Sequence, residues 1–194
     1  MESLFIADDG LARCGWCVSA PDYIEYHDRE WGRPVHGDVA LFERITLEAF
    51  QSGLSWLTIL RKRDNFRAAF AGFDFDAVAR FDAGDAERLM NDAGIVRNRR
   101  KIEATIVNAR AALALQEAHG PGALDALVWS HAPVAGRPRP HAVSDLVPIS
   151  PESSALSKAL KARGFVFVGP TTMHAAMQAC GLIDDHLVGC HRAA

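Results

Sequence analysis

Long apolar segments are absent from this sequence of 194 residues: no run reaches the ~18 residues that a membrane-spanning helix needs. Its first residues, MESLFIADD, have neither the basic segment nor the apolar stretch of a signal peptide. These absences predict a cytoplasmic protein without a membrane partner. Cysteine is scarce as well, and in a reducing cytoplasm disulfides are not expected. Metal binding, reactive thiols or plain packing then remain for Cys14, Cys17, Cys180 and Cys190.

A strong charge imbalance is also missing, because the formal net charge is only -3. Any DNA-binding role must therefore depend on a local basic patch rather than on the whole surface. Hydrophobic residues make up 49% and charged residues 23% of the chain, an ordinary globular composition. A chain of this length without internal repeats suits one domain, or one domain of two lobes around a shared core. We expect it to act as a monomer.

Convincing strand patterns are lacking, and the predicted fold class is mostly α. Apolar spacing, prolines and glycines predict helices over residues 21–31, 39–51, 85–93, 99–118, 151–163 and 170–180. Asp38 is a plausible N-cap for the second of these helices. Residues 1–12 are interpreted as an N-terminal extension, and residues 13–194 as a single domain. The apolar run 165–168 is short enough to be extended.

Glu48 is the most informative single residue. Leu41, Ile45 and Glu48 follow an i, i+4, i+7 spacing, which places the carboxylate on the apolar stripe of a helix. A buried carboxylate without a partner is costly, and such groups concentrate at functional sites. Trp56 follows shortly afterwards, and a carboxylate beside an aromatic face favours a cationic ring. The alternative is a helix-end glutamate that pairs with a nearby arginine.

Aromatic side chains gather between residues 14 and 31, where Trp16, Tyr23, Tyr26 and Trp31 occur. One interpretation is an aromatic core. The other is a binding pocket, because the tyrosines follow an i, i+3 spacing beside His27, which would place their hydroxyls and the imidazole on one face. Buried polar groups of this kind need partners, and a ligand can supply them.

Cysteine and histidine occur together near both ends of the chain. Cys14 and Cys17 lie near the start, and His186 precedes Cys190 by one helical turn near the end, while His27 adds another imidazole. Structural zinc sites take four such ligands in a tetrahedral arrangement. The combination favours zinc over free buried cysteines with surface histidines. Four protein ligands would join the chain ends and leave no open position for catalysis.

Basic residues crowd a turn between two expected helices, although a helix N-terminus disfavours cations. A bound DNA phosphate would resolve this conflict, since exposed N–H groups and arginines both suit an anion. A solvated run of charges is the alternative. The candidate residues for the DNA backbone are Gly94, Arg97, Arg99, Arg100 and Lys101. Cations elsewhere that could widen the patch are Arg61, Lys62, Arg63, Lys158, Lys161 and Arg163.

Together these segments resemble the 3-methyladenine DNA glycosylase I family of the helix-hairpin-helix superfamily. The resemblance extends from about residue 13 to residue 190. The matching stretches are Arg13-Cys-Gly-Trp16, Tyr26-His27-Asp28, Glu30-Trp31-Gly32, Leu47-Glu48, Gly53-Leu54-Ser55-Trp56, Asp92-Ala-Gly-Ile95, Leu156-Ser-Lys-Ala-Leu-Lys161, Met177-Gln-Ala-Cys-Gly-Leu182, Asp185-His186 and Val188-Gly-Cys190.

The resemblance implies a fold and a site. It implies a helix-hairpin-helix lobe over about residues 36–120, and a second lobe of residues 13–35 and 150–194 joined by zinc. Glu48 and Tyr26 would be the catalytic pair and would hydrogen-bond the extruded base. The stacking and walling residues would be Trp56, Trp16 and Trp31. The ligands of one structural zinc ion would be Cys14, His27, His186 and Cys190, with Cys17 a possible competitor for Cys14.

The implied activity is excision of 3-methyladenine from alkylated double-stranded DNA, which releases the free base and leaves an abasic site for base excision repair. The methylated base is cationic and leaves as a neutral molecule, so selection of the cation matters more than acid catalysis. Asp125 is a weak candidate for an aspartate that supports the attacking water. The alternatives are a zinc-stapled DNA-binding module without catalysis and a zinc hydrolase, which needs an open metal position.

Overall fold

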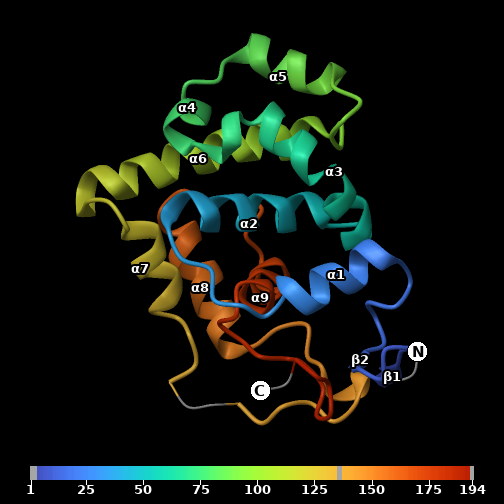
Figure 1. Cartoon of the computed structure of the whole chain (residues 1–194). Helices are drawn as coiled ribbons and strands as arrows, with labels where there is room; N and C mark the ends of the chain where they lie inside the picture. Colours follow the sequence, from blue (N-terminus) through green and yellow to red (C-terminus); the bar gives the residue numbers. More distant parts are fainter. Residues whose placement is uncertain (1–3, 135–136, 193–194) are drawn as a thin grey trace.

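The computed structural model describes residues 4–134 and 137–192, and within them the chain is mostly α, as predicted. Figure 1 shows α2 in the middle, with the layer of α3 to α6 on one side and α1, α8 and α9 on the other. In these described residues the elements are β1 (Leu4–Ile6), β2 (Ala12–Cys14), α1 (Pro21–Arg29), α2 (Asp38–Gln51), α3 (Trp56–Ala69), the 3-10 turn η1 (Ala71–Phe73), α4 (Phe75–Ala79), α5 (Ala83–Asn91), α6 (Arg99–His119), α7 (Ala123–Trp129), the 3-10 turn η2 (Val143–Asp145), α8 (Pro151–Lys161) and α9 (Pro170–Ala179).

The helix starts follow local side-chain chemistry. Ser150 caps α8, because its hydroxyl accepts from the backbone N–H of Ser153, and Pro151 takes the first helical position. The proposed cap Asp38 is wrong: Gly37 is the N-cap of α2, and the Asp38 carboxylate instead accepts from the N–H groups of Gly122 and Asp125. Asp38 thus fixes the start of α7 rather than its own helix.

The sequence interpretation missed α3, α4 and α7. In α3 the buried side chains are few and are separated by a run of cations and polar residues, so the apolar period is weak: Trp56, Ile59, Phe66 and Ala69. The other two helices span only one to two turns. The fully buried phenylalanines of α2, α3, η1 and the junction between α3 and η1 form the centre of the core: Phe42, Phe50, Phe66, Phe70 and Phe73.

Two short strands correct the expectation that none is present. β1 and β2 pair in an antiparallel hairpin with Leu4 opposite Cys14. The C-terminal segment joins it, because the N–H of His191 donates to the carbonyl of Ala12 at 2.7 Å. Residues 4–12 are therefore held to the fold by backbone hydrogen bonds although most of their side chains are exposed, whereas residues 1–3 of the expected extension lie outside the described residues. No helix in the described part of the chain is long and apolar enough to cross a bilayer.

The apolar run 165–168 is not a strand. Its backbone partner is a side chain, since the amide of Asn108 in α6 both accepts from the N–H of Val166 and donates to its carbonyl, at 2.7 and 3.0 Å. Phe165 and Val168 are buried on either side of this contact. The run therefore connects α8 to α9 and fastens both to the long helix α6.

Candidate functional site

A cavity of about 220 Å³ lies where α1, α2 and α9 meet the start of α3. It contains all five side chains expected to bind a base, so the sequence prediction of a pocket is supported over a solid aromatic core. Its lining residues are Trp16, Tyr23, Tyr26, Trp31, Glu48, Gln51, Trp56, Leu146, Ala175 and Gln178.

Glu48 lies in the cavity wall near the end of α2 and is only 4% exposed. Leu41 and Ile45 are buried on the same stripe, which confirms the spacing argument. Burial raises the pKa of Glu48 to about 8, although the charge of Arg44 one turn earlier opposes this shift. Within the described residues no group forms a hydrogen bond with the carboxyl. The group is thus buried, poorly solvated and available to a ligand.

Two tyrosines from α1 face the same cavity. Burial, followed by the charge of Glu48, raises the pKa of Tyr26 well above its usual value, so its hydroxyl keeps its proton at neutral pH and can donate. Burial raises the pKa of Tyr23 to about 12 in the same way. The two rings stack with centroids 6.4 Å apart. Their hydroxyls make the cavity a site for a polar planar ligand.

Tryptophan rings supply the remaining flat walls. Trp56 lies 5.5 Å from the Tyr26 ring, and its buried indole Nε1 has no acceptor among the described residues. Trp16 packs edge-on against Trp31 at 5.0 Å and against Tyr23 at 4.9 Å. Electron-rich faces around one carboxylate suit a cationic ring.

Four lining residues were missed by the sequence interpretation. Gln51 follows Glu48 by three residues on α2, so the i, i+3 rule could have found it. Ala175 and Gln178 share the same spacing on α9. Leu146 comes from the loop after η2, and its place depends on tertiary packing that no local pattern reveals.

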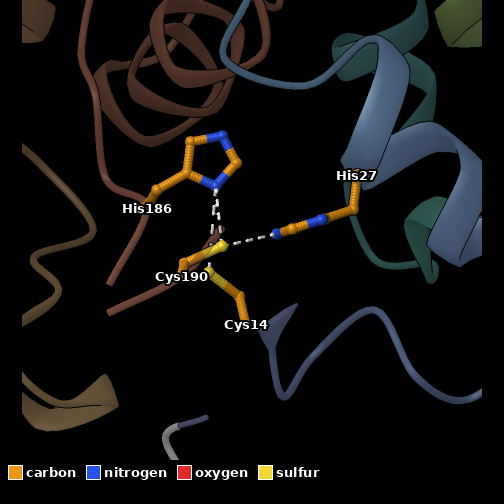
Figure 2. A group of neighbouring side chains, drawn as sticks. All are labelled: Cys14, His27, His186 and Cys190. Atoms are coloured by element: carbon orange, nitrogen blue, oxygen red, sulfur yellow. Dashed lines mark hydrogen bonds between the residues drawn. The ribbon is translucent and has the colours of Figure 1, made fainter. Parts of the chain in front are cut away.

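His27 does not line this cavity and belongs to a second cluster. Figure 2 shows Cys14, His27, His186 and Cys190 directed toward one another, although they come from β2, α1 and the C-terminal segment. All four side chains are buried, and one donor atom from each lies within 4.8 Å of the others. The expectation that His27 shares a face with the tyrosine hydroxyls was wrong.

The donor spacing fits a tetrahedral metal site. Cys190 Sγ lies 3.4 Å from His27 Nε2 and 3.8 Å from His186 Nδ1, and Cys14 Sγ lies 3.9 Å from that nitrogen. Zinc bonds of about 2.3 Å to sulfur and about 2.0 Å to nitrogen give tetrahedral N–S edges of about 3.5 Å. Two sulfurs and two imidazole nitrogens are also the ligand types that Zn²⁺ prefers. The residues therefore fit such an ion.

Two details of this cluster concern expectations drawn from the sequence. Cys17 is fully buried but is not part of the group of four. His186 and Cys190 were expected one helical turn apart, yet the segment that carries them is irregular. Its chain reversal includes Gly189 at φ 90°, a backbone angle that favours glycine.

The turn between α5 and α6 is held by side chains from α3. Lys62 Nζ donates to the carbonyls of Ala93 and Gly94, and Asn65 donates to that of Gly94. The N–H of Gly94 donates to Asp92, and a Cβ at Gly94 would lie 2.9 Å from the Asp92 carboxylate. Gly94 therefore shapes the hairpin, and its N–H does not point to a phosphate, contrary to its assignment as a contact.

Lys101 is a further correction. Its ammonium group is buried beneath the hairpin and donates to the carbonyls of Phe50 and Ser52, at 2.8 and 2.6 Å. It ties α6 to the end of α2 instead of facing DNA. Arg97, Arg99 and Arg100 are exposed, as a phosphate contact requires.

Three of the cations proposed for DNA binding already have acidic partners. Arg99 pairs with Glu87 at 2.7 Å, and Arg61 pairs with Asp22. Arg63 forms a two-pronged pair with Glu30. These ion pairs partly neutralise the proposed patch, including Arg99 of the hairpin itself.

Asp125 lies away from the cavity lining, at the start of α7. Its carboxylate accepts from the backbone N–H of Gly37 and lies 3.2 Å from His36 Nδ1. These contacts fasten the start of α2 to α7. A structural role accounts for Asp125 without any part in the chemistry.

Comparison with known proteins decides the family. The model of the methyladenine glycosylase family matches residues 16–193. The chain belongs to this family. The chain is 49% identical over 183 residues to DNA-3-methyladenine glycosylase 1 of Escherichia coli (strain K12), and the match covers 93% of the chain and 96% of the relative. It is 47% identical to the DNA-3-methyladenine glycosylase of Haemophilus influenzae over 181 residues, 92% of this chain and 96% of the relative.

Solved structures agree with this assignment. A crystal structure of 3-methyladenine DNA glycosylase I superposes with a TM-score of 0.89 at 45% identity, covering 94% of this chain and all of that one. The enzyme from Staphylococcus aureus gives 0.86 at 36% identity, covering 92% and 95%. A variant of 3-methyladenine DNA glycosylase I solved with 3-methyladenine gives 0.85, also at 36% identity, covering 92% and 96%. The methyladenine glycosylase fold is thus established for this chain.

Proposed function

We propose that this protein removes 3-methyladenine from alkylated double-stranded DNA as a monofunctional glycosylase of base excision repair. Its relatives from Escherichia coli and Haemophilus influenzae carry the name of this activity, and a structural neighbour was solved with 3-methyladenine bound. In the reaction, water adds to the deoxyribose C1′ and the glycosidic electron pair leaves with the base. The cationic base departs neutral, the proton of the water goes to solvent, and an abasic site remains.

The carboxyl of Glu48 in its aromatic cavity carries this proposal. Burial favours the protonated form of this carboxyl, as its pKa of about 8 indicates. A cationic base beside it would favour the carboxylate, because opposite charges attract strongly where water is excluded. Normal adenine is neutral and provides no such gain. The pocket therefore selects the methylated base by its charge, with Tyr26 and Trp56 positioning the ring.

The exposed hairpin side chains Arg97, Arg99 and Arg100 are suited to the DNA backbone. In the described part of the chain the N–H groups of Arg99 and Arg100, at the start of α6, have no protein acceptor. Free N–H groups and guanidinium groups at one helix N-terminus favour a phosphate. This arrangement positions the duplex and reads no sequence.

A structural zinc ion belongs to the same proposal. Cys14, His27, His186 and Cys190 would hold it, and four protein ligands leave no position for a reacting water. When bound, the ion would supply a crosslink between the N-terminal hairpin, α1 and the C-terminal segment. A zinc hydrolase is therefore disfavoured, and a DNA-binding module without catalysis has no use for the Glu48 cavity.

Release of free 3-methyladenine from methylated DNA tests the proposed function. The protein is incubated with methylated and with unmethylated duplex, and the released bases are separated by chromatography while alkali-labile sites are counted. We expect 3-methyladenine and an equal number of abasic sites from methylated DNA alone. Release of unmodified adenine at a similar rate, or no release, would contradict the proposal.

A further inference from the structure

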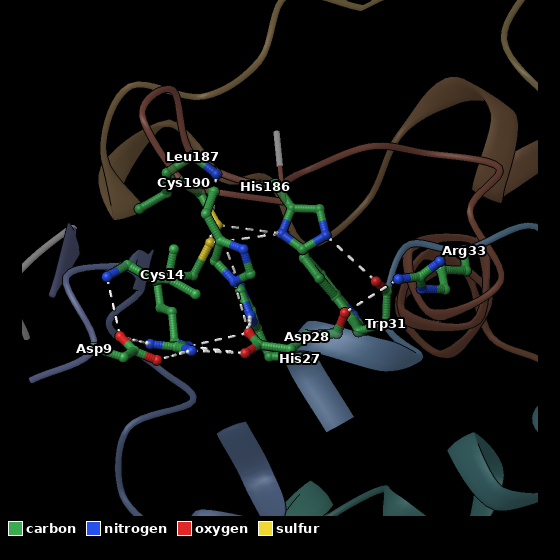
Figure 3. Close-up of polar contacts among 12 residues, drawn as sticks. Asp9, Cys14, His27, Asp28, Trp31, Arg33, His186, Leu187 and Cys190 are labelled. Carbon is green, nitrogen blue, oxygen red and sulfur yellow. Dashed lines mark hydrogen bonds and ion pairs between the residues drawn. The ribbon is translucent and has the colours of Figure 1, made fainter. Parts of the chain in front are cut away.

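Asp28 directly follows His27 on α1, and its carboxylate is the centre of a polar network beside the Cys/His cluster (Figure 3). Its Oδ1 lies 2.8 Å from His27 Nδ1 and 2.8 Å from His191 Nε2. Arg13 donates to it from Nε, at 3.0 and 3.1 Å, and from an Nη atom at 2.8 Å. One carboxylate thus joins β2, α1 and the C-terminal segment, the same parts of the chain that supply the four metal-ligand candidates.

The contact with Asp28 determines which nitrogen of His27 carries the proton. A carboxylate only accepts hydrogen bonds, so His27 Nδ1 must be the N–H donor. The lone pair of the neutral ring then lies on Nε2, and Nε2 is the atom that faces Cys190 Sγ at 3.4 Å. A carboxylate that orients a histidine in this way fixes its ring and makes it a better metal ligand.

In His186 the two ring nitrogens have the opposite roles to those in His27. Its Nε2 lies 3.3 Å from the carbonyl oxygen of Trp31, which leaves Nδ1 toward the two sulfurs. Gly32 permits this approach, because a Cβ there would lie 2.8 Å from His186 Nε2. The two histidines therefore present different ring nitrogens, and each is determined by its own acceptor.

The Asp28 carboxylate is itself held in place. Arg13 is 4% exposed, and its guanidinium is shared between Asp28 and the exposed Asp9. An arginine fork on a carboxylate fixes its orientation as well as its charge. His191 approaches Asp28 from the C-terminal segment. A side chain kept in place from several directions is suited to aligning its neighbour.

We propose that Asp28 is a positioning residue of the metal site: clamped by Arg13 and His191, it fixes His27 as the Nδ1–H form with Nε2 toward the metal. The proposal rests on the metal site described above. Asp28 does not bind the ion. It acts through His27, and its loss weakens zinc binding without removing a ligand.

Zinc affinity of the full chain tests this role. Competition with a chromophoric chelator is measured for the parent, for Asp28→Asn and for the control Asp9→Asn. The Asp28→Asn side chain would keep the shape, but with its oxygen on Arg13 it would turn an N–H₂ group toward His27. We expect this variant to weaken zinc binding roughly 10–100-fold, as is typical when such an outer partner is removed. Asp9→Asn also removes a carboxylate from Arg13 but leaves His27 untouched, so its affinity should stay within about twofold.

A second readout separates positioning from general stability. Ring ¹⁵N chemical shifts of the zinc-loaded parent should show His27 protonated at Nδ1, and thermal melts should show that Asp28→Asn lowers the Tm of the loaded chain more than that of the stripped chain. Equal zinc affinities of parent and Asp28→Asn, or a His27 protonated at Nε2, would overturn the role of Asp28. A parent that binds no zinc would overturn the metal site with it, while its excision of 3-methyladenine would leave the proposed function standing.

Discussion

The carbonyl oxygen of Trp31 lies 3.3 Å from Nε2 of His186, so a residue that lines the cavity is hydrogen-bonded to a metal-ligand candidate. Their rings also meet edge to face at 4.6 Å. Trp16, another wall residue, packs on His27 at 5.3 Å. The Cys/His cluster therefore supports the cavity as well as joining the chain ends.

Metal removal should consequently weaken base binding as well as stability. Cys14→Ser is expected to lose zinc, melt at lower temperature and bind free 3-methyladenine less tightly, because the supports of Trp16 and Trp31 loosen. Cys17→Ser is the matched control, since Cys17 is buried nearby but outside the cluster. Metal analysis, melting curves and titration of the base would check this. Zinc lost from Cys17→Ser and kept by Cys14→Ser would exchange the two roles.

The burial of the Glu48 carboxyl should lower the free energy of unfolding. Its pKa is raised from 4.5 to about 8 on folding, so between these pH values the folded chain holds a proton that the unfolded chain has lost. Stability must then fall as pH rises from about 4.5 to about 8 and level off above. Glu48→Gln removes this penalty and should stabilise the protein by up to about 3 kcal/mol at pH 7, at about 1.4 kcal/mol per pKa unit, with no gain at pH 4. Urea unfolding of both proteins at pH 7 and pH 4 measures this difference in stability. An equal difference at both pH values would show that the titration of Glu48 is not the cause.

The same pKa predicts a pH profile for excision. Below about pH 8 the free enzyme must release the Glu48 proton before it can pair with the cationic base. kcat/KM should rise with pH toward about 8 and then level off, because this ratio reports the pKa of the free enzyme. Glu48→Gln should lose this rising limb. A parent profile that is flat from pH 6 to 9 would contradict the assignment.

The hairpin arginines should contribute to DNA affinity through charge alone. Arg99→Ala and Arg100→Ala are each expected to weaken binding to all sequences and to reduce the log–log salt slope by about 0.9 for each phosphate that no longer has a cationic partner. Arg80→Ala is a suitable control, because Arg80 is exposed just after the end of α4, outside the hairpin, and pairs with Asp76. Fluorescence anisotropy over a salt series measures the slopes. Slopes unchanged from the parent would move the DNA face elsewhere.

Much of the site could be predicted from the sequence, because its main residues lie on single helices or in rare local combinations. The stripe that places Glu48 in the wall depends only on helical spacing, and Tyr26 and Trp31 come from the same dense segment. The sequence alone could not show which aromatic residues fill the core and which line the cavity. The buried phenylalanines fill the core, whereas Trp16, Trp31 and Trp56 line the cavity, a division that depends on packing between helices.

The sequence predictions were wrong for side chains that form hydrogen bonds with backbone groups far away in the sequence. Lys101 belongs to a basic run in the sequence, yet it reaches carbonyls about fifty residues earlier in the chain. Asp38 caps a helix that begins more than eighty residues later. Local patterns contain no information on such partners. The expected monomer and cytoplasmic location stay predictions.

The most direct test of the account is the single-turnover rate of 3-methyladenine excision by Glu48→Gln compared with the parent, together with titration of the free base into both. The variant keeps the shape and one acceptor but loses the charge that selects the cation. We predict that the activation free energy rises by about 1.5–3 kcal/mol, which lowers the rate roughly 10–150-fold. Slow excision should remain detectable, and most binding of the free base should be lost. Equal rates and affinities would remove Glu48 from recognition. Complete loss of excision with base binding intact would make it an obligatory catalytic group and contradict the claim that it acts by selecting the cation.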